Sequence, residues 1–296
     1  MKNADYHLVT NIISDLGEGP SWDDERHRLY WVDITGQQIH IWDPKLNESR
    51  SIQTGQWTGC VVPSHDDELI CALHKGFYKL DLNTEGFSEI GLPGERDYDL
   101  SVNRFNDGKC DAYGRFWAGT TSFEEEYQKG CLFYLDTDQK IHLVRRKVTV
   151  SNGMGWSPDN QIMYYIDSGV RQVFAYDFDL ETATLRNERV LIDFAHEFGN
   201  PDGMAVDAEG MLWIAHWDGY EISRWNPKTG LKIEKYALPV ARVTSCAFGG
   251  DALDELYITS ARYGLSTQQL AEQPLAGRLF VMKTSTRGIS TYRFGG

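Results

Sequence analysis

A segment of constant outline recurs six times in this chain and constrains its fold more than any other feature. In the clearest copy, Asp202 begins the segment and the apolar pair Leu212-Trp213 follows ten residues later. The polar residue that begins each copy is called a head here, and its apolar pair follows after nine to eleven residues. The heads lie 40 to 50 residues apart, and in chain order they are Glu18, Thr58, Asp107, Asn152, Asp202 and Ser245. A fixed period of this length indicates an array of equal units, each beginning with a strand, a turn and a second strand.

A second pattern counts the same units independently. Short alternating runs, most of them followed by Asp or Asn, indicate a third strand in each unit, at residues 39–43, 77–81, 132–136, 173–177, 222–226 and 279–282. Amphipathic helical spacing is nearly absent, and Gly, Asn and Asp separate the runs. The sequence therefore predicts an all-β fold, a six-bladed β-propeller. We expect one domain over residues 1–296, because closed all-β architectures of this size commonly form a single domain.

The apolar run at residues 7–13 precedes the first head and has no unit of its own. A terminal strand often completes the last blade of a propeller, which removes an open sheet edge. We expect residues 7–13 to have this role, with residues 289–294 as the alternative.

The heads determine where a functional site is expected. Innermost strands begin at one face of the disc, so all six heads surround one mouth of the central channel. One Asp-Gly or Asn-Gly pair alone is usually an ordinary turn. Convergence of oxygen donors from Glu18, Asn152, Asp202 and either Asn106 or Asp107 instead predicts a bound cation, because unpaired buried anions are costly. An all-oxygen set favours calcium, with magnesium and manganese as alternatives.

Long connections are expected over the same mouth. Residues 91–102, 121–130 and 261–277 enter or leave strands at this face, and Ser266 in the last of them is placed to cap a short helix. Such loops would shape a pocket above the ion. Arg104 is either part of this pocket or an ordinary surface arginine. The acidic run at residues 124–126 is likewise either functional or a solvated turn. His216 and Trp217 end a second strand near the mouth, where they either line the pocket or belong to the core.

Four motifs resemble those of a known family. They are Leu-Gly-Glu-Gly-Pro at 16–20, Asn-Arg-Phe-Asn-Asp-Gly at 103–108, Ser-Asn-Gly-Met at 151–154 and Pro-Asp-Gly-Met at 201–204. In order and spacing they resemble the regucalcin (senescence marker protein), gluconolactonase and luciferin-regenerating enzyme family, over about residues 16–277. The resemblance implies a six-bladed propeller that hydrolyses sugar lactones with one central divalent ion, calcium first and zinc, manganese or magnesium as alternatives.

The resemblance also implies roles for individual residues. Glu18, Asn152 and Asp202 match the metal ligands, and Asp202 also matches the general base, with Glu18 as the competing candidate. The family residues that contact sugar hydroxyls correspond to Arg104, Asn106 and Glu124, with Asp107 beside them in the channel. The family's usual Gly-Thr-Met segment is replaced at 119–121 by Gly-Thr-Thr. This departure leaves Glu125 as an alternative to Glu124.

Composition limits the partners. A net charge of −14 disfavours nucleic acid and anionic membrane surfaces. Five cysteines without a Cys-x-x-Cys pair, and no leader or membrane-spanning run, favour reduced thiols and a cytoplasmic location. We expect a small-molecule sugar lactone as partner and a monomer or weak oligomer. A propeller hydrolase of phosphotriesters and a noncatalytic calcium-binding propeller are the alternative functions, because this fold hosts many activities.

Overall fold

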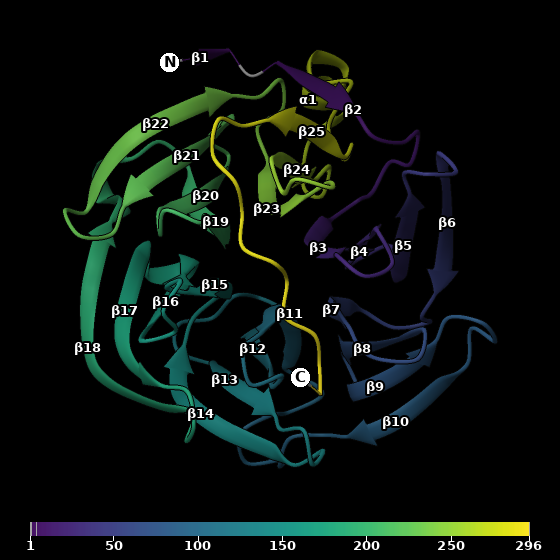
Figure 1. Cartoon of the computed structure of the whole chain (residues 1–296), viewed down its shortest axis with the longest axis vertical. Helices are drawn as coiled ribbons and strands as arrows, with labels where there is room; N and C mark the ends of the chain where they lie inside the picture. The colour runs from purple at the N-terminus through teal and green to yellow at the C-terminus, as the bar shows by residue number, and fades with distance from the viewer. Residues whose placement is uncertain (1, 4, 296) are drawn as a thin grey trace.

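A computed structural model describes residues 2–3 and 5–295 of the chain. Six sheets, each built on four antiparallel strands, surround a central channel, and the innermost strand of each sheet faces that channel (Figure 1). The prediction of a six-bladed β-propeller is confirmed. Each head lies in an innermost strand, so the repeats in the sequence correspond to the blades.

Each blade begins at the channel and continues outward in chain order. Blade one contains β3 (Gly17–Asp23), β4 (Arg28–Asp33), β5 (Gln38–Asp43) and β6 (Glu48–Gln53). Blade two contains β7 (Thr58–Pro63), β8 (Glu68–Leu73), β9 (Gly76–Asp81) and β10 (Phe87–Gly91). Blade three contains β11 (Asn103–Cys110), β12 (Phe116–Ser122), β13 (Gly130–Leu135) and β14 (Ile141–Val148).

The other three blades repeat this plan. Blade four contains β15 (Ser151–Trp156), β16 (Ile162–Asp167), β17 (Gln172–Asp179) and β18 (Thr184–Asp193). Blade five contains β19 (Asn200–Val206), β20 (Leu212–Trp217), β21 (Glu221–Asn226) and β22 (Leu231–Ala237), with β1 (Lys2–Asn3) added in parallel to β22. Blade six contains β23 (Val243–Gly249), β24 (Glu255–Ser260), β25 (Phe280–Lys283) and β2 (Tyr6–Leu8).

The N-terminal strand closes the ring, as the sequence predicts. β2 pairs antiparallel with β25, with Tyr6 opposite Met282 and Leu8 opposite Phe280. The predicted strand at residues 7–13 is wrong in its bounds. β2 ends at Leu8 because β25 begins at Phe280, and the one further backbone bond that residues 9–13 make in the described part of the chain runs from Val9 N–H to Leu279 O at 3.0 Å.

Helices are few and short. The 3₁₀ turns η1 (Ser168–Val170) and η2 (Phe194–His196) and the α-helix α1 (Thr267–Glu272) lie in loops. The predicted cap is confirmed, because the Ser266 side chain accepts from the Gln269 N–H in a capping box. No helix in the described part of the chain is long and apolar enough to cross a membrane.

The turns at the face opposite the heads are fixed by buried aspartates. Oδ1 of Asp207 accepts from the N–H groups of Glu209 and Met211. Its Oδ2 accepts from Trp213 Nε1 at 2.9 Å and from Arg224 Nε at 2.8 Å. One carboxylate therefore shapes the turn between two strands and also anchors a core tryptophan.

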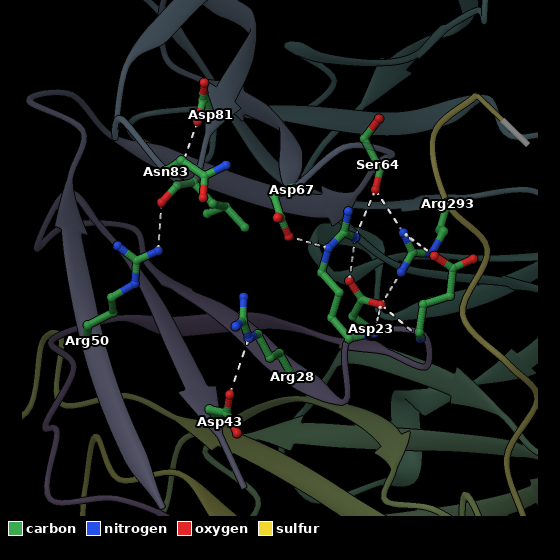
Figure 2. Close-up of polar contacts among 12 residues, drawn as sticks. Asp23, Arg28, Asp43, Arg50, Ser64, Asp67, Asp81, Asn83 and Arg293 are labelled. Atoms are coloured by element: carbon green, nitrogen blue, oxygen red, sulfur yellow. Dashed lines mark hydrogen bonds and ion pairs between the residues drawn. The ribbon is translucent and has the colours of Figure 1, made fainter. Parts of the chain in front are cut away.

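The C-terminal strap, defined as residues 284–295, crosses the channel at this opposite face (Figure 1). Phe294 N–H donates to Pro63 O at 2.9 Å, and Gly288 forms a β-bridge with Asp207. Arg293 contacts the Asp23 carboxylate and donates to Ser64 O at 2.9 Å (Figure 2). Residues 289–294 therefore do not complete a blade, which was their alternative prediction. They join blades instead and cover the far end of the channel.

Candidate functional site

A cavity of about 400 Å³ lies at the mouth where the heads meet. Its lining includes four side chains carried by innermost strands: Glu18 from β3, Asn106 from β11, Asn152 from β15 and Asp202 from β19. All four are buried, with 3% to 6% of their surface exposed. The structure therefore brings the three predicted metal ligands, Glu18, Asn152 and Asp202, to one cavity.

A local irregularity of the strands presents the heads to the channel. In all six blades the pairing of the innermost strand shifts register beside the head, for example between Ser151 and Met154 and between Pro201 and Met204. A β-bulge redirects a side chain that regular pleating would point elsewhere. The glycine after the head permits close approach of neighbouring strands, since a Cβ on Gly153 would lie 2.6 Å from Met204.

Two oxygens in the cavity have no hydrogen-bond partner among the residues described. They are Oδ1 of Asn152 and Oδ1 of Asp202, and both are buried. Asn152 Nδ2 donates to Ser168 Oγ at 2.9 Å, and Ser168 Oγ donates to Pro201 O at 2.5 Å. The amide nitrogen of Asn152 is thus occupied, and its oxygen remains as an acceptor. Two buried acceptors of this kind fit a cation.

The electrostatics of the carboxylates indicate the same requirement. Burial, reinforced by the nearby charge of Asp107, raises the pKa of Glu18 to about 8. Burial and the charges of Glu18, Asp107 and Glu125 raise the pKa of Asp202 well above its usual range. Anionic carboxylates repel one another here unless a positive charge lies between them. A divalent cation would supply that charge, and the oxygen donors suit a hard ion.

Arg104 and Asn106 form a polar pair beside these carboxylates. Arg104 Nη1 donates to Asn106 Oδ1 at 2.5 Å, and Asn106 Nδ2 donates to Ser151 O at 2.7 Å. The Arg104 guanidinium lies 5.5 Å from the centre of the Trp57 ring. Only 6% of Arg104 is exposed, so the prediction that it belongs to the pocket holds over the surface alternative.

The other predicted residues are placed differently. Glu125 lines the cavity, whereas Glu124 does not, and the substrate contact of either glutamate stays a prediction. Asp107 lines a separate cavity of about 80 Å³, to which the strap also contributes lining residues. Trp217 lines the main cavity. His216 is fully buried and hydrogen-bonds to Phe198 O and Ser223 Oγ, so it belongs to the core.

Sequence reasoning missed Arg171, Ser168, Asn200 and Tyr263, which also line the cavity. Ser168 and Arg171 belong to the turn between β16 and β17. The topological rule that placed long insertions at this mouth applies equally to such a short turn. A polar turn after a second strand was therefore visible in the sequence, but this turn is as short as the corresponding turns of other blades and did not stand out.

Two other groups of side chains in the described residues have ligand-type spacing for a metal. In the first, Lys232 contacts both Glu197 and Glu221 beside His216 and supplies the positive charge itself. In the second, Asp138 pairs with Lys140 at 2.6 Å on the surface. Neither group offers the unpaired buried oxygens that the central cavity has.

The chain is similar to known proteins over most of its length. The family described as "SMP-30/Gluconolactonase/LRE-like region" matches residues 16–262, which is most of the chain. The protein belongs to this family. Within the SMP-30/gluconolactonase family, it is 38% identical over 292 residues to the putative sugar lactone lactonase YvrE of Bacillus subtilis, with 99% of each chain covered. It is 36% identical over 299 residues to regucalcin of Danio rerio, with 100% of each covered. A luciferin-regenerating enzyme superposes with a TM-score of 0.91, at 29% identity and 99% coverage of both chains.

Proposed function

We propose that this protein hydrolyses sugar lactones, with one divalent ion held by Glu18, Asn152 and Asp202. The observation that carries the proposal is the pair of unpartnered oxygens, on Asn152 and Asp202, in the same cavity as the Arg104–Asn106 pair. Family membership supports it, since a relative that covers the whole chain is named a putative sugar lactone lactonase.

The donor set decides which ion is proposed. Carboxylate and amide oxygens from three strands suit calcium best, because calcium accepts irregular oxygen geometry and magnesium demands a near-ideal octahedron. Manganese and zinc are the further alternatives. When bound, such a cation acts as a Lewis acid on a carbonyl oxygen and stabilises negative charge that develops there.

The side chains of this protein have separate tasks in the proposal. Arg104 donates to sugar hydroxyls, Asn106 donates to or accepts from them, and Glu125 accepts from a hydroxyl at the rim. Asp202 takes a proton from the attacking water, and burial, which raises the pKa of this carboxyl, makes it a stronger base than an exposed aspartate. Glu18 is the competing base, because burial also raises its pKa. No nucleophilic side chain is needed for this route.

A panel assay tests the function. Aldonolactones and a phosphotriester are offered to the protein loaded in turn with calcium, magnesium, manganese and zinc, and acid release is followed by pH-stat. We expect lactone opening to exceed phosphotriester cleavage, and exhaustive chelation to abolish it. Turnover of the phosphotriester alone, or of no compound with any ion, would reject the lactonase proposal.

A further inference from the structure

The central cavity contains two guanidinium groups, which neutral sugar hydroxyls do not require. Two arginines line it, Arg104 and Arg171, and neither forms an ion pair with a carboxylate in the described part of the chain. Arg104 donates to Phe105 O and Asn106 Oδ1, and its buried Nε has no partner among these residues. Both neighbours are neutral groups. Glu125 and Glu18 act on Arg104 through their charges but form no ion pair with it among the described residues, so its free donor remains available to a ligand.

Arg171 is held in place by neutral acceptors as well. It follows η1 with a left-handed backbone, at φ 57°, and its Nη1 donates to Asn200 Oδ1 at 2.5 Å. Nη2 donates to three backbone carbonyls of the segment before β19, at 2.8 to 3.1 Å; these belong to Phe194, Glu197 and Gly199. These contacts fix the guanidinium at the cavity wall. None of them neutralises it, and its Nε–H makes no hydrogen bond with the described residues.

A nearby arginine shows the usual arrangement. Arg242 stacks on Trp217, with 4.6 Å from its guanidinium carbon to the ring centre, and its Nε lies 3.0 Å from Asp218 Oδ1. Arg242 does not line the cavity. Arg242, outside the cavity, thus has a carboxylate partner, and the two arginines lining the cavity do not.

The charge of the whole cavity depends on the proposed ion. Three carboxylates line the cavity, from Glu18, Glu125 and Asp202, against two guanidinium groups. The ionised cavity alone therefore carries one net negative charge. A divalent cation would convert this to one net positive charge, and a cavity of one sign concentrates ligands of the other.

We propose that Arg171, together with Arg104, forms a subsite for an anionic group, so that the preferred substrate is a sugar lactone bearing a carboxylate or a phosphate. This inference rests on the proposed lactonase function. Arginine suits both groups because its planar fork matches their oxygens. The cavity volume of about 400 Å³ lies in the range of small-molecule sites and leaves room for the extra group. The reaction remains a hydrolysis: water adds to the carbonyl, the ring ester bond breaks, and the ring oxygen takes a proton.

The kinetic test compares lactones that differ in one group. They are gluconolactone, the same lactone phosphorylated on its terminal hydroxyl group, and the lactone of glucaric acid, which has a carboxylate at the terminal carbon. We expect kcat/KM for at least one anionic lactone to exceed that for gluconolactone. In Arg171→Gln this preference should fall about 10- to 100-fold, the size of one charge-assisted hydrogen bond. Arg171→Lys keeps the charge and should retain part of the preference. The phosphate and carboxylate arms show which anion the subsite accepts.

Two controls separate recognition from structure. Arg242→Gln removes an arginine at the same mouth that already has a carboxylate partner, so it should change kcat/KM for all three lactones by the same factor. Displacement of the segment before β19 by Arg171→Gln would also affect all three equally. An unchanged ratio of anionic to neutral kcat/KM in Arg171→Gln would overturn the proposal, as would a wild-type preference for gluconolactone.

A binding measurement keeps the inference separable from the lactonase proposal. Glucarate and gluconate are titrated into the calcium-loaded protein by calorimetry. Glucarate should bind at least about 10-fold more tightly than gluconate, and Arg171→Gln should remove that difference. This result would support the anion subsite even if no lactone were opened. Opening of gluconolactone with equal affinity for both acids would reject the subsite alone.

Discussion

Asp167 fixes the chain immediately before Asn152: its Oδ1 accepts a hydrogen bond of 2.9 Å from the N–H of Val150, and its Oδ2 one of 2.9 Å from Thr149. Asp33 repeats the arrangement in blade one, accepting from Leu16 at 3.0 Å, two residues before Glu18. Both aspartates end a second strand and lie fifteen positions after the head of their blade. Two of the proposed metal ligands are therefore positioned by the same device.

Removing this device should weaken metal binding. Asp167→Ala leaves two buried N–H groups unpaired, each costing about 1–3 kcal/mol, and releases the segment that places Asn152. We expect a lower free energy of unfolding in urea and a weaker calcium affinity by calorimetry. Asp111→Ala is the control, because Asp111 is an equally buried carboxylate at the far face. It should lower stability and leave calcium affinity unchanged. Wild-type affinity in Asp167→Ala would contradict this account of positioning.

The raised pKa of Glu18 predicts how pH affects the metal-free protein. Its pKa rises from 4.5 to about 8 on folding, so the folded protein retains a proton that the unfolded chain releases. This contribution to stability is complete below pH 4.5 and is lost as pH rises through about 8. A bound cation replaces the proton, so calcium should raise Tm more at pH 8.5 than at pH 5.5. Thermal scans with calcium and with chelator measure this difference. Glu18→Gln should reduce its pH dependence, and an equal or larger shift at pH 5.5 would count against the site.

The C-terminal strap should contribute to stability through Arg293. The guanidinium reaches Asp23, which is 1% exposed, and Ser64 O (Figure 2). Removing one partner of a buried ion pair costs about 3–5 kcal/mol. Because Arg26 still binds Asp23 at 3.0 Å, we expect Arg293→Ala to lose stability at the lower end of that range. Urea unfolding measures it. Lys140→Ala, in an exposed pair with Asp138, should have no measurable effect, and equal losses in both variants would show that the strap contact is unimportant.

Local patterns in the sequence predicted most of the architecture. The period of the heads and the alternating third strands gave the number of blades, because each blade is a contiguous unit whose strands pair with their sequence neighbours. The strap was not predictable in the same way. Its contacts join Arg293 to Asp23 and Phe294 to Pro63, and no local pattern indicates which residues so far apart will meet.

The sequence predicted that the three proposed ligands would meet, but it predicted only part of the cavity around them. Glu18, Asn152 and Asp202 meet because each occupies the same position in its blade. Glu125 replaces Glu124 at the cavity because residues 123–129 form an irregular loop, where side-chain direction follows no fixed period. Arg171 reaches the wall from a left-handed position after η1, a conformation that its residue type does not indicate.

In the proposed mechanism, Asp202 both binds the ion and acts as the base. Asp202→Asn keeps the shape and an oxygen donor but removes the basicity, so turnover should fall far more than metal affinity. Glu18→Gln is the matched control, because it removes one charge from the same cavity. With both variants saturated with calcium, kcat for Asp202→Asn should be lower by a further factor of about 10² to 10⁴. Equal losses, or a larger loss in Glu18→Gln, would assign the base to Glu18 or to another group.

The most direct test of the central claim is a calcium titration of the metal-free protein in which bound calcium and lactone hydrolysis are measured in the same samples. The account predicts that hydrolysis is absent without the ion, rises in proportion to occupancy and reaches its maximum at one calcium per chain. Asn152→Ala, which removes one unpartnered oxygen, should need a higher calcium concentration for the same activity. Full hydrolysis with no bound metal, or one calcium bound per chain without any lactone opened, would contradict it.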